Sequence, residues 1–223
     1  MAASPTGGVD TRDMVVVHTA FRREFGLAPG LVRRVAAGDR QRAGVVGDHL
    51  DLLTAMLHHH HAGEDRLLWP KLHARVPSDV APVVSLMEEQ HARIHAANDR
   101  VHAGLEGWRT AASEDEGEAL AQSLEEVDAA LDEHLAAEEE RLLPIAAENL
   151  THDEWAQLGQ EGMGGVRKSQ LPLVFGMLQY EGDPDVIAMM LAHAPAPARL
   201  LMPFLAPRAF ARYAVRVHGT ATP

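Results

Sequence analysis

Two histidine–glutamate pairs are the residues of this chain whose types and spacing most directly indicate chemistry. His60 and Glu64 are four residues apart, and so are His134 and Glu138. In an α-helix this spacing places both side chains on one face, about 6 Å apart, so that both can reach one metal ion or one pair of ions. Each pair lies on an apolar stripe, where a carboxylate without a partner is costly. A buried glutamate there needs a cation, a network of donors or a proton.

The sequence around the two pairs repeats. Residues 60–70, HHAGEDRLLWP, align without gaps on residues 134–144, HLAAEEERLLP, with five of eleven positions identical. An isolated histidine–glutamate pair arises easily by chance in so acidic a chain. Two pairs in matching context, both on inward stripes, favour a shared binding role over a structural hydrogen-bond network.

Further imidazoles can complete a site. His91 and His95 form a third pair with four-residue spacing, and His18 lies on the apolar face of an earlier segment. The chain has no cysteine, so only imidazole and carboxylate can bind a metal. Nitrogen and oxygen donors fit iron, manganese or zinc, and two carboxylates that can bridge favour a dinuclear centre. A mononuclear zinc site or a purely structural bundle is the alternative.

These residues require long amphipathic helices to bring them together. Apolar residues at steps of three and four predict an antiparallel up-down-up-down four-helix bundle. We expect a helix from Asp10 to about residue 26 with a short piece at 31–35, and a second over 41–75, kinked at Pro70. We expect a third from about residue 81, a loop at 113–117 and a fourth over 120–145.

The character of the chain changes after residue 149. Thr151 and Glu154 form a capping-box signature for a fifth helix, and short helical pieces are expected at 171–178, 185–193 and 207–217. Residues 167–223 carry six basic and three acidic side chains, against a net charge of -12 for the whole chain. We therefore expect the tail to lie on the acidic bundle, burying Phe204, Phe210 and Tyr213 and pairing the ladder Arg208, Arg212 and Arg216 with bundle carboxylates.

Composition excludes several classes of function. The negative net charge argues against a nucleic-acid partner, because binding to nucleic acid requires basic side chains that neutralise its phosphates. The longest apolar run is too short to span a bilayer, and the opening stretch lacks the basic and apolar regions of a signal peptide. We therefore expect a cytoplasmic protein with no membrane partner.

The order His18, His60-x-x-x-Glu64, His91-x-x-x-His95, His134-x-x-x-Glu138 resembles the hemerythrin-like (HHE cation-binding) domain. The resemblance covers residues 10–150, the di-iron bundle, and leaves residues 151–223 as a helical extension. It implies two non-haem iron ions (Fe2+/Fe3+) joined by an oxo or hydroxo bridge. One iron would be held by His91, His95 and His134, the other by His18 and His60, with Glu64 and Glu138 bridging.

The resemblance also implies an open position on the second iron, where dioxygen, nitric oxide or peroxide can bind. The chain departs from oxygen-carrying hemerythrins in the narrower spacing of its last pair, in the glutamate there and in its tail. We therefore expect binding or sensing of oxygen, nitric oxide or iron. The alternative is an enzyme with catalase-like peroxide removal or oxidation of a small substrate. The redox partner and the catalytic residues are not identified by the sequence.

The remaining histidines are expected to have lesser roles. His59, His61 and His102 are expected to lie outside the coordination shell, as candidate proton shuttles, because an imidazole titrates near neutral pH. Surface positions are expected for His49, His73, His152, His193 and His218. A ferritin-like site needs paired Glu-x-x-His motifs, and only Glu88-x-x-His91 fits.

Overall fold

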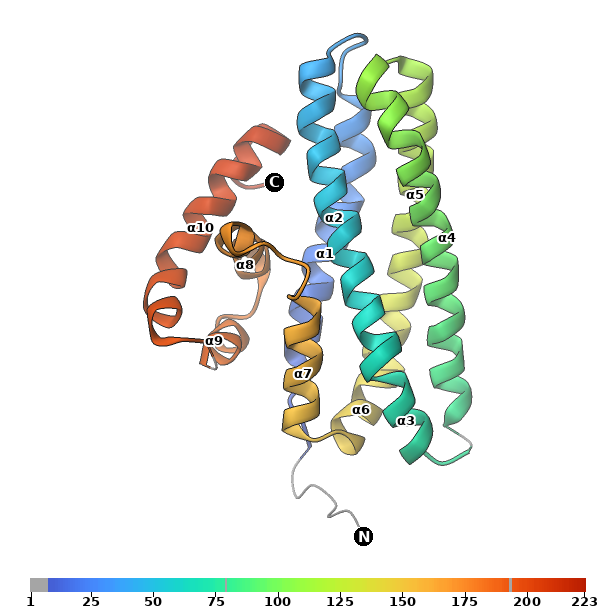
Figure 1. Ribbon diagram of the computed structural model, residues 1–223, viewed down its shortest axis with the longest axis vertical. Helices are drawn as coiled ribbons and strands as arrows, with labels where there is room; N and C mark the ends of the chain where they lie inside the picture. Colours follow the sequence, from blue (N-terminus) through green and yellow to red (C-terminus); the bar gives the residue numbers. More distant parts are fainter. Residues whose placement is uncertain (1–7, 79, 193) are drawn as a thin grey trace.

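Four long helices build the main body of the molecule. The computed structural model describes residues 8–78, 80–192 and 194–223, in which α1 (Arg12–Arg33), α2 (Arg40–Leu67), α4 (Ala81–Ala111) and α5 (Glu114–Ala137) lie side by side (Figure 1). Each helix contacts the next one along the chain, and α5 also packs on α1, which closes the bundle. No strand occurs in the described ranges. The all-helical bundle with extra C-terminal helices is thereby confirmed.

Helix α1 is longer than the sequence predicts. It continues through Pro29 to Arg33, where a break and a separate short piece were expected. Ala28, Leu31 and Val32 are buried on either side of the proline. Burial of these apolar side chains outweighs the one main-chain hydrogen bond that a proline removes. The separation of α4 from α5 is also shorter than expected, because Ser113 caps α5 and the helix begins at Glu114.

Both helices that carry a histidine–glutamate pair are interrupted just after the glutamate. The chain turns at Leu68 between α2 and α3 (Trp69–Arg75), and a π-helical turn, η1 (Glu138–Leu142), joins α5 to α6 (Leu143–Asn149). Pro70 and Pro144 follow these interruptions at matching positions of the repeat. A proline ring clashes with the carbonyl four residues before it, which explains both breaks. The expected kink at Pro70 is thus a break between two helices.

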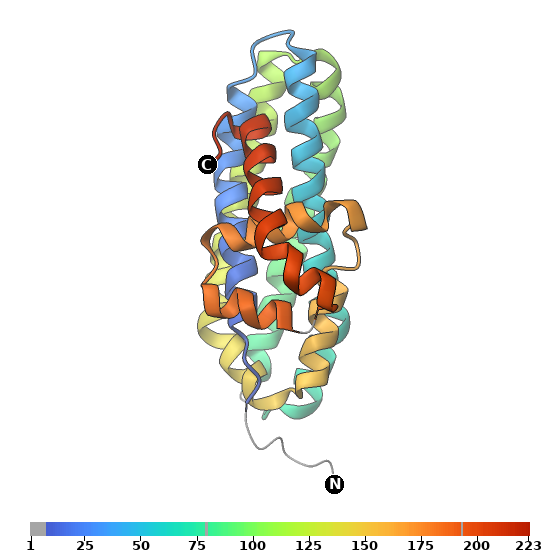
Figure 2. The same cartoon turned by 90° about the vertical axis from the view of Figure 1, so that its left-hand side faces the viewer.

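In the described part of the C-terminal segment there are five further helical pieces: α7 (His152–Gly162), η2 (Lys168–Gln170), α8 (Leu171–Glu181), α9 (Pro184–Ala192) and α10 (Ala196–His218). The capping box of Thr151 and Glu154 is present, as predicted. Helix α7 lies along α2, whereas α8, α9 and α10 form a layer on one side of the bundle, with α10 crossing it obliquely (Figures 1 and 2). Gly176 in α8 allows α10 to approach closely, because a Cβ there would clash with the Ala206 carbonyl.

Phe210 and Arg23 are central to the contact between the tail and the bundle. Phe210 is 2% exposed and belongs to the same apolar core as the bundle helices. The Arg23 guanidinium donates to a Glu181 carboxylate oxygen at 2.7 Å and to the Met177 carbonyl at 3.0 Å, and it lies over the Phe210 ring. In this ion pair the bundle supplies the arginine and the tail supplies the carboxylate. The sequence had predicted the reverse, with arginines of the tail paired to carboxylates of the bundle.

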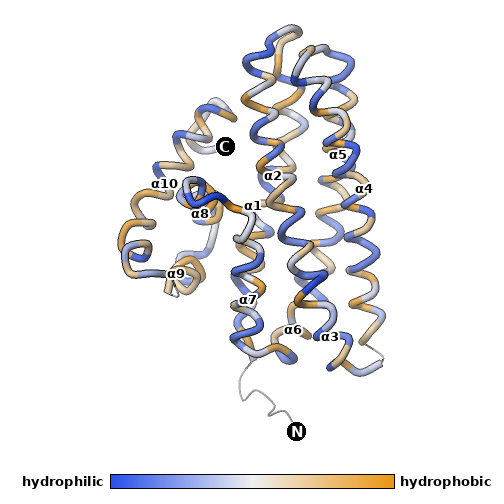
Figure 3. The backbone as a smooth tube through the Cα atoms, viewed as in Figure 1, coloured by the Kyte–Doolittle hydropathy of each residue, from blue (hydrophilic) through white to orange (hydrophobic). Residues whose placement is uncertain are grey.

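Two expectations for the tail are wrong. Phe204 is 65% exposed, and hydrophobic residues continue along the outer part of α10 (Figure 3). No ion pair joins Arg208, Arg212 or Arg216 to the bundle within the described residues. Arg208 instead donates to the Phe204 carbonyl of its own helix. The pattern of charges along α10 did not reveal which of its faces is covered.

Helices long and apolar enough to cross a membrane are absent from the described part of the chain.

We expect Phe210→Ala to lower the free energy of unfolding by about 3 kcal/mol, because truncation leaves a cavity in a closed core. Phe204→Ala is the matched control and should change it by less than about 0.5 kcal/mol, since an exposed ring loses little contact. Urea unfolding followed by circular dichroism measures both. Equal effects of the two substitutions would show that the tail does not dock as described.

Candidate metal centre

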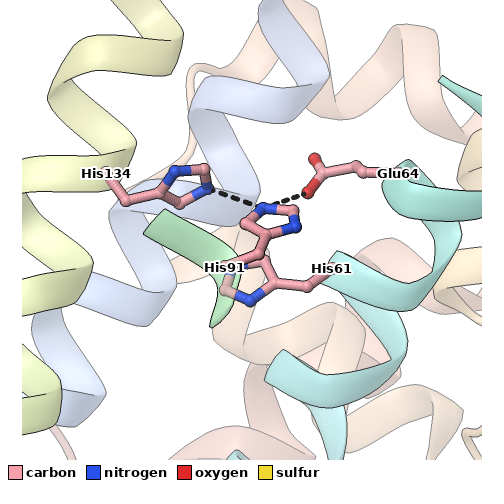
Figure 4. A group of neighbouring side chains, drawn as sticks. All are labelled: His61, Glu64, His91 and His134. Atoms are coloured by element: carbon pink, nitrogen blue, oxygen red, sulfur yellow. Dashed lines mark hydrogen bonds and ion pairs between the residues drawn. The ribbon is translucent and has the colours of Figure 1, made fainter. Parts of the chain in front are cut away.

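Buried histidines and glutamates from the four bundle helices meet inside the bundle. They form two groups in which the donor atoms all lie within 4.8 Å of one another. The first group, drawn in Figure 4, is His61, Glu64, His91 and His134. The second is His18, His60, Glu64 and Glu138. Every member is buried, and Glu64 belongs to both groups.

The two carboxylates lie between the imidazoles of both groups. The Oε1 atom of Glu64 is 3.5 Å from His60 Nε2, and its Oε2 atom is 3.4 Å from His91 Nε2. The Oε2 atom of Glu138 is 3.4 Å from His18 Nε2 and 3.6 Å from His134 Nε2. Each carboxylate therefore lies near imidazoles of both groups, and this arrangement fits a metal centre.

Three of the histidines are oriented by partners on their outer nitrogen. The Nδ1 atoms of His18, His91 and His134 lie 2.9 Å from a Glu139 oxygen, 2.7 Å from an Asp65 oxygen and 3.2 Å from the Gln90 amide oxygen. For His18 and His134, an acceptor at Nδ1 keeps the proton on that nitrogen and directs the lone pair of Nε2 inward. Metal-binding histidines almost always show this arrangement. His91 Nε2 lies 3.1 Å from His134 Nε2 and, because the pKa of His91 is raised to about 9, it carries a proton that a bound cation would displace.

The inward atoms lack the hydrogen bonds that buried polar groups normally have. Both carboxylate oxygens of Glu64 and Glu138 have no hydrogen-bond partner among the described residues, and neither does Nε2 of His18, His60 or His61. An unpaired buried polar group costs about 1–3 kcal/mol, and a charged one more. Cations coordinated by these atoms would remove that cost, so the residues present fit a metal centre with nitrogen and oxygen ligands.

The carboxylates have opposite electrostatic properties. Burial raises the pKa of Glu138 well above its ordinary value, and the negative charge of Glu64 raises it further. Burial alone would raise the pKa of Glu64 too, but His60 and His91 stabilise its charged form and lower the pKa. Burial therefore favours the protonated form of Glu138, and a bound cation would displace that proton.

The imidazoles are mostly neutral. Burial lowers the pKa of His60 to about 4 and that of His134 to about 3, and it also lowers the pKa of His61. Burial would lower the pKa of His91 as well, but its contacts with Asp65 and Glu64 raise it to about 9. Neutral rings offer the free lone pairs that metal coordination requires.

The π-helical turn fixes which of two adjacent glutamates faces inward. Glu138 begins η1 and is buried, whereas the neighbouring Glu139 lies nearer the surface, where it accepts from His18 Nδ1 and from Arg22 at 2.7 Å. Single π-turns within α-helices are frequent at functional sites. The inward position of Glu138 agrees with the sequence interpretation, but Glu139 supports His18, a role that the sequence did not reveal.

Six of the seven predicted ligands meet inside the bundle, and His95 does not. His95 is only half-buried and lies outside both groups, next to His58. His61 takes the place expected for His95, with its ring stacked on His91 at 4.1 Å between centroids. The correction has a geometric cause: Ile94 takes the inward direction of α4, which turns His95 about 100° away.

The sequence held a signal for His61 that the interpretation missed. His61 is four residues after Leu57 and three before Glu64, so all three lie on one inward stripe of α2. The other expected proton shuttles lie away from the site, with His59 half-buried and His102 exposed.

The expected surface histidines divide into two classes. His73 and His152 are exposed as predicted. The expectation is wrong for His49, which is fully buried, and for the side chain of His218, which is 3% exposed. His49 contacts Tyr213 of the tail, and His218 belongs to the tail and contacts Glu24 of the bundle, so the local pattern predicted neither position. His193 lies outside the described residues.

Comparison with known proteins gives one match. The family model described as the Hemerythrin HHE cation binding domain matches residues 9–146, more than half of the chain. Neither the curated proteins nor the solved structures include a significant match.

We expect Glu138→Gln to stabilise the metal-free protein at high pH. A raised pKa in the folded state means that folding takes up a proton, so stability falls as pH rises above about 4.5. Glutamine removes this loss, so the variant should be more stable than the unsubstituted protein at pH 8 and nearly equal to it at pH 5. Thermal unfolding after chelation measures the difference.

The control for this experiment is Glu139→Gln. Burial opposes the charge of Glu139, but His18 and Arg22 lower its pKa, so the substitution should destabilise the protein at pH 8. A gain of stability in both variants, or in neither, would contradict the different roles of the two carboxylates.

Proposed function

The chain belongs to the hemerythrin HHE cation-binding family. We propose that its bundle holds two iron ions and binds dioxygen, nitric oxide or peroxide. The observation that carries the proposal is the position of Glu64, whose two oxygens face histidines of different groups. A single-ion site has no need of a second group of donors around the same carboxylate. Two carboxylates shared between imidazole-rich groups support a dinuclear centre of redox-active metal.

The proposed ligands divide unequally between the two ions. His61, His91 and His134 would hold one ion, and His18 and His60 the other, with Glu64 and Glu138 contributing to both. The second ion would thus have one imidazole fewer than the first. An ion with fewer protein ligands retains a position for an exogenous molecule, which we assign to the His18–His60 side.

An apolar cavity adjoins that side of the centre. It has a volume of about 100 Å³ and is lined by His60, by Met14, Val17 and Phe21 of the bundle, and by Trp155 and Leu158 of α7. A cavity of this size admits a diatomic molecule or peroxide but is smaller than the usual site of a larger organic ligand. Its apolar lining suits dioxygen and nitric oxide.

Bound iron would supply a redox-active Lewis acid that holds the small molecule. The chain supplies the remaining properties of the site. Glu139 holds His18, and Asp65 holds His91, so that their Nε2 atoms point inward. The buried imidazoles and their apolar neighbours limit access of bulk water.

A second candidate function is enzymatic removal of peroxide. The observation that favours it is that the two orienting carboxylates reach toward solvent, with side chains 25% exposed for Glu139 and 43% for Asp65. Each therefore connects a buried imidazole with water and could carry protons to and from the centre.

The ligand assignment predicts different effects of two histidine substitutions. His61→Ala should lower the iron content from two per chain to one or fewer, because it removes a donor of the first group. His95→Ala is the matched control and should retain two irons. Colorimetric iron analysis with near-ultraviolet absorption measures both. Loss of iron in His95→Ala with full retention in His61→Ala would reverse the assignment.

The two functions predict different responses of the reduced, iron-loaded protein. A binding protein should give a long-lived spectral change with nitric oxide or oxygen that disappears when the gas is removed. An enzyme should evolve oxygen from hydrogen peroxide over many turnovers. An oxygen electrode and an absorption spectrometer measure the two responses. If the iron-loaded protein shows neither, the proposal of a small-molecule site is wrong.

A further inference from the structure

A third group of metal-ligating side chains lies between the tail and the bundle. It consists of Glu24 on α1, His49 on α2 and His218 at the end of α10. Glu24 is six residues beyond His18, about 9 Å further along α1. The group is separate from the two described above and shares no residue with them.

The three side chains converge on one point. The Oε2 atom of Glu24 is 3.3 Å from His49 Nε2 and 3.3 Å from His218 Nε2. All three side chains are buried, with no more than 3% of any exposed. These three atoms make no hydrogen bond with any described residue, because the geometry at 3.3 Å is not that of a hydrogen bond.

In Glu24 and His49, the polar atom that does not face the shared point has a partner among the neighbouring residues. Arg23 donates to Glu24 Oε1 from two nitrogens, at 3.0 and 2.9 Å. Tyr213 lies with its hydroxyl 3.1 Å from His49 Nδ1. Oε2 of the glutamate and Nε2 of the histidine therefore remain directed at the shared point. The same arrangement of an occupied outer atom and a free inner atom orients the histidines of the bundle centre.

The two distances from Glu24 Oε2 match those between ligands of a tetrahedral ion, and the two imidazole nitrogens lie within 4.8 Å of each other. Zinc binds imidazole nitrogen and carboxylate oxygen at about 2.0–2.1 Å, which separates two tetrahedral ligands by about 3.3 Å. A hydrogen-bond network would leave three buried atoms unpaired, at a cost that one divalent cation removes. Two imidazoles with one carboxylate form a donor set that suits a zinc-like transition ion.

We propose that Glu24, His49 and His218 bind one divalent transition ion of the zinc class, with water as the remaining ligand. Because His218 ends α10 while the other ligands belong to α1 and α2, the ion would fasten the tail to the bundle. It would act next to the contacts that Arg42 makes with the carbonyls of Arg216 and Val217.

Zinc binding to the iron-loaded full chain tests the proposal. Equilibrium dialysis with elemental analysis should find one zinc per chain in addition to the iron of the bundle. His218→Gln should weaken this binding by about 100-fold or more, because it removes a direct ligand. The matched control His152→Gln changes an exposed histidine of α7 and should bind zinc like the unsubstituted protein.

A second measurement follows the tail itself. Zinc should slow tryptic cleavage at Arg208 and Arg212 in the unsubstituted protein and in His152→Gln, but not in His218→Gln. The difference of one zinc between the two variants does not depend on which metal fills the bundle. The proposal is overturned if the unsubstituted chain takes up no zinc beyond the bundle, or if His218→Gln binds and is protected equally well.

Discussion

The burial of two carboxylates among mostly neutral imidazoles is the constraint on which the rest of the structure depends. Glu64 and Glu138 are completely buried, and their oxygens lack hydrogen-bond partners within the described residues. Such an arrangement is unfavourable for an isolated polypeptide and favourable around cations. The apolar stripes of four helices hold the donors together, so the bundle provides the rigidity and the cations would provide the missing charge.

Much of the fold and of the site could be predicted from the sequence, because both follow from local periodicity. Helical spacing placed His60 with Glu64 and His134 with Glu138 on inward faces, and the structure brings them together. The choice between His61 and His95 required the rotation of each helix within the bundle. Adjacent residues differ by about 100° around a helix. The spacing of His61 from Leu57 and Glu64 indicated an inward position, but spacing alone did not show that His95 lies outside the site.

Other features depend on contacts between segments distant in sequence. The burial of His49 and His218 follows from the way α10 crosses α1 and α2, which no local pattern determines. The same holds for Phe204 and Phe210, which have the same side chain and lie on the same helix, although Phe204 is exposed and Phe210 is buried. Helix α1 continues through Pro29 because the surrounding core compensates for the lost hydrogen bond. The tail thus required tertiary packing, whereas most of the bundle followed from periodicity.

Glu64 belongs to both groups of metal-ligating side chains, and this has a consequence for how the centre binds and releases metal ions. One of its oxygens faces each group, so in the proposed two-ion centre an ion bound at one position would fix the carboxylate for the other and reduce the ordering that the next ion requires. Arrival of the first cation also favours release of the proton from Glu138, which prepares a second shared ligand. In the proposed two-ion centre, partly filled molecules should therefore be scarce, and a chelator should convert the doubly occupied form to the empty one in a single cooperative transition.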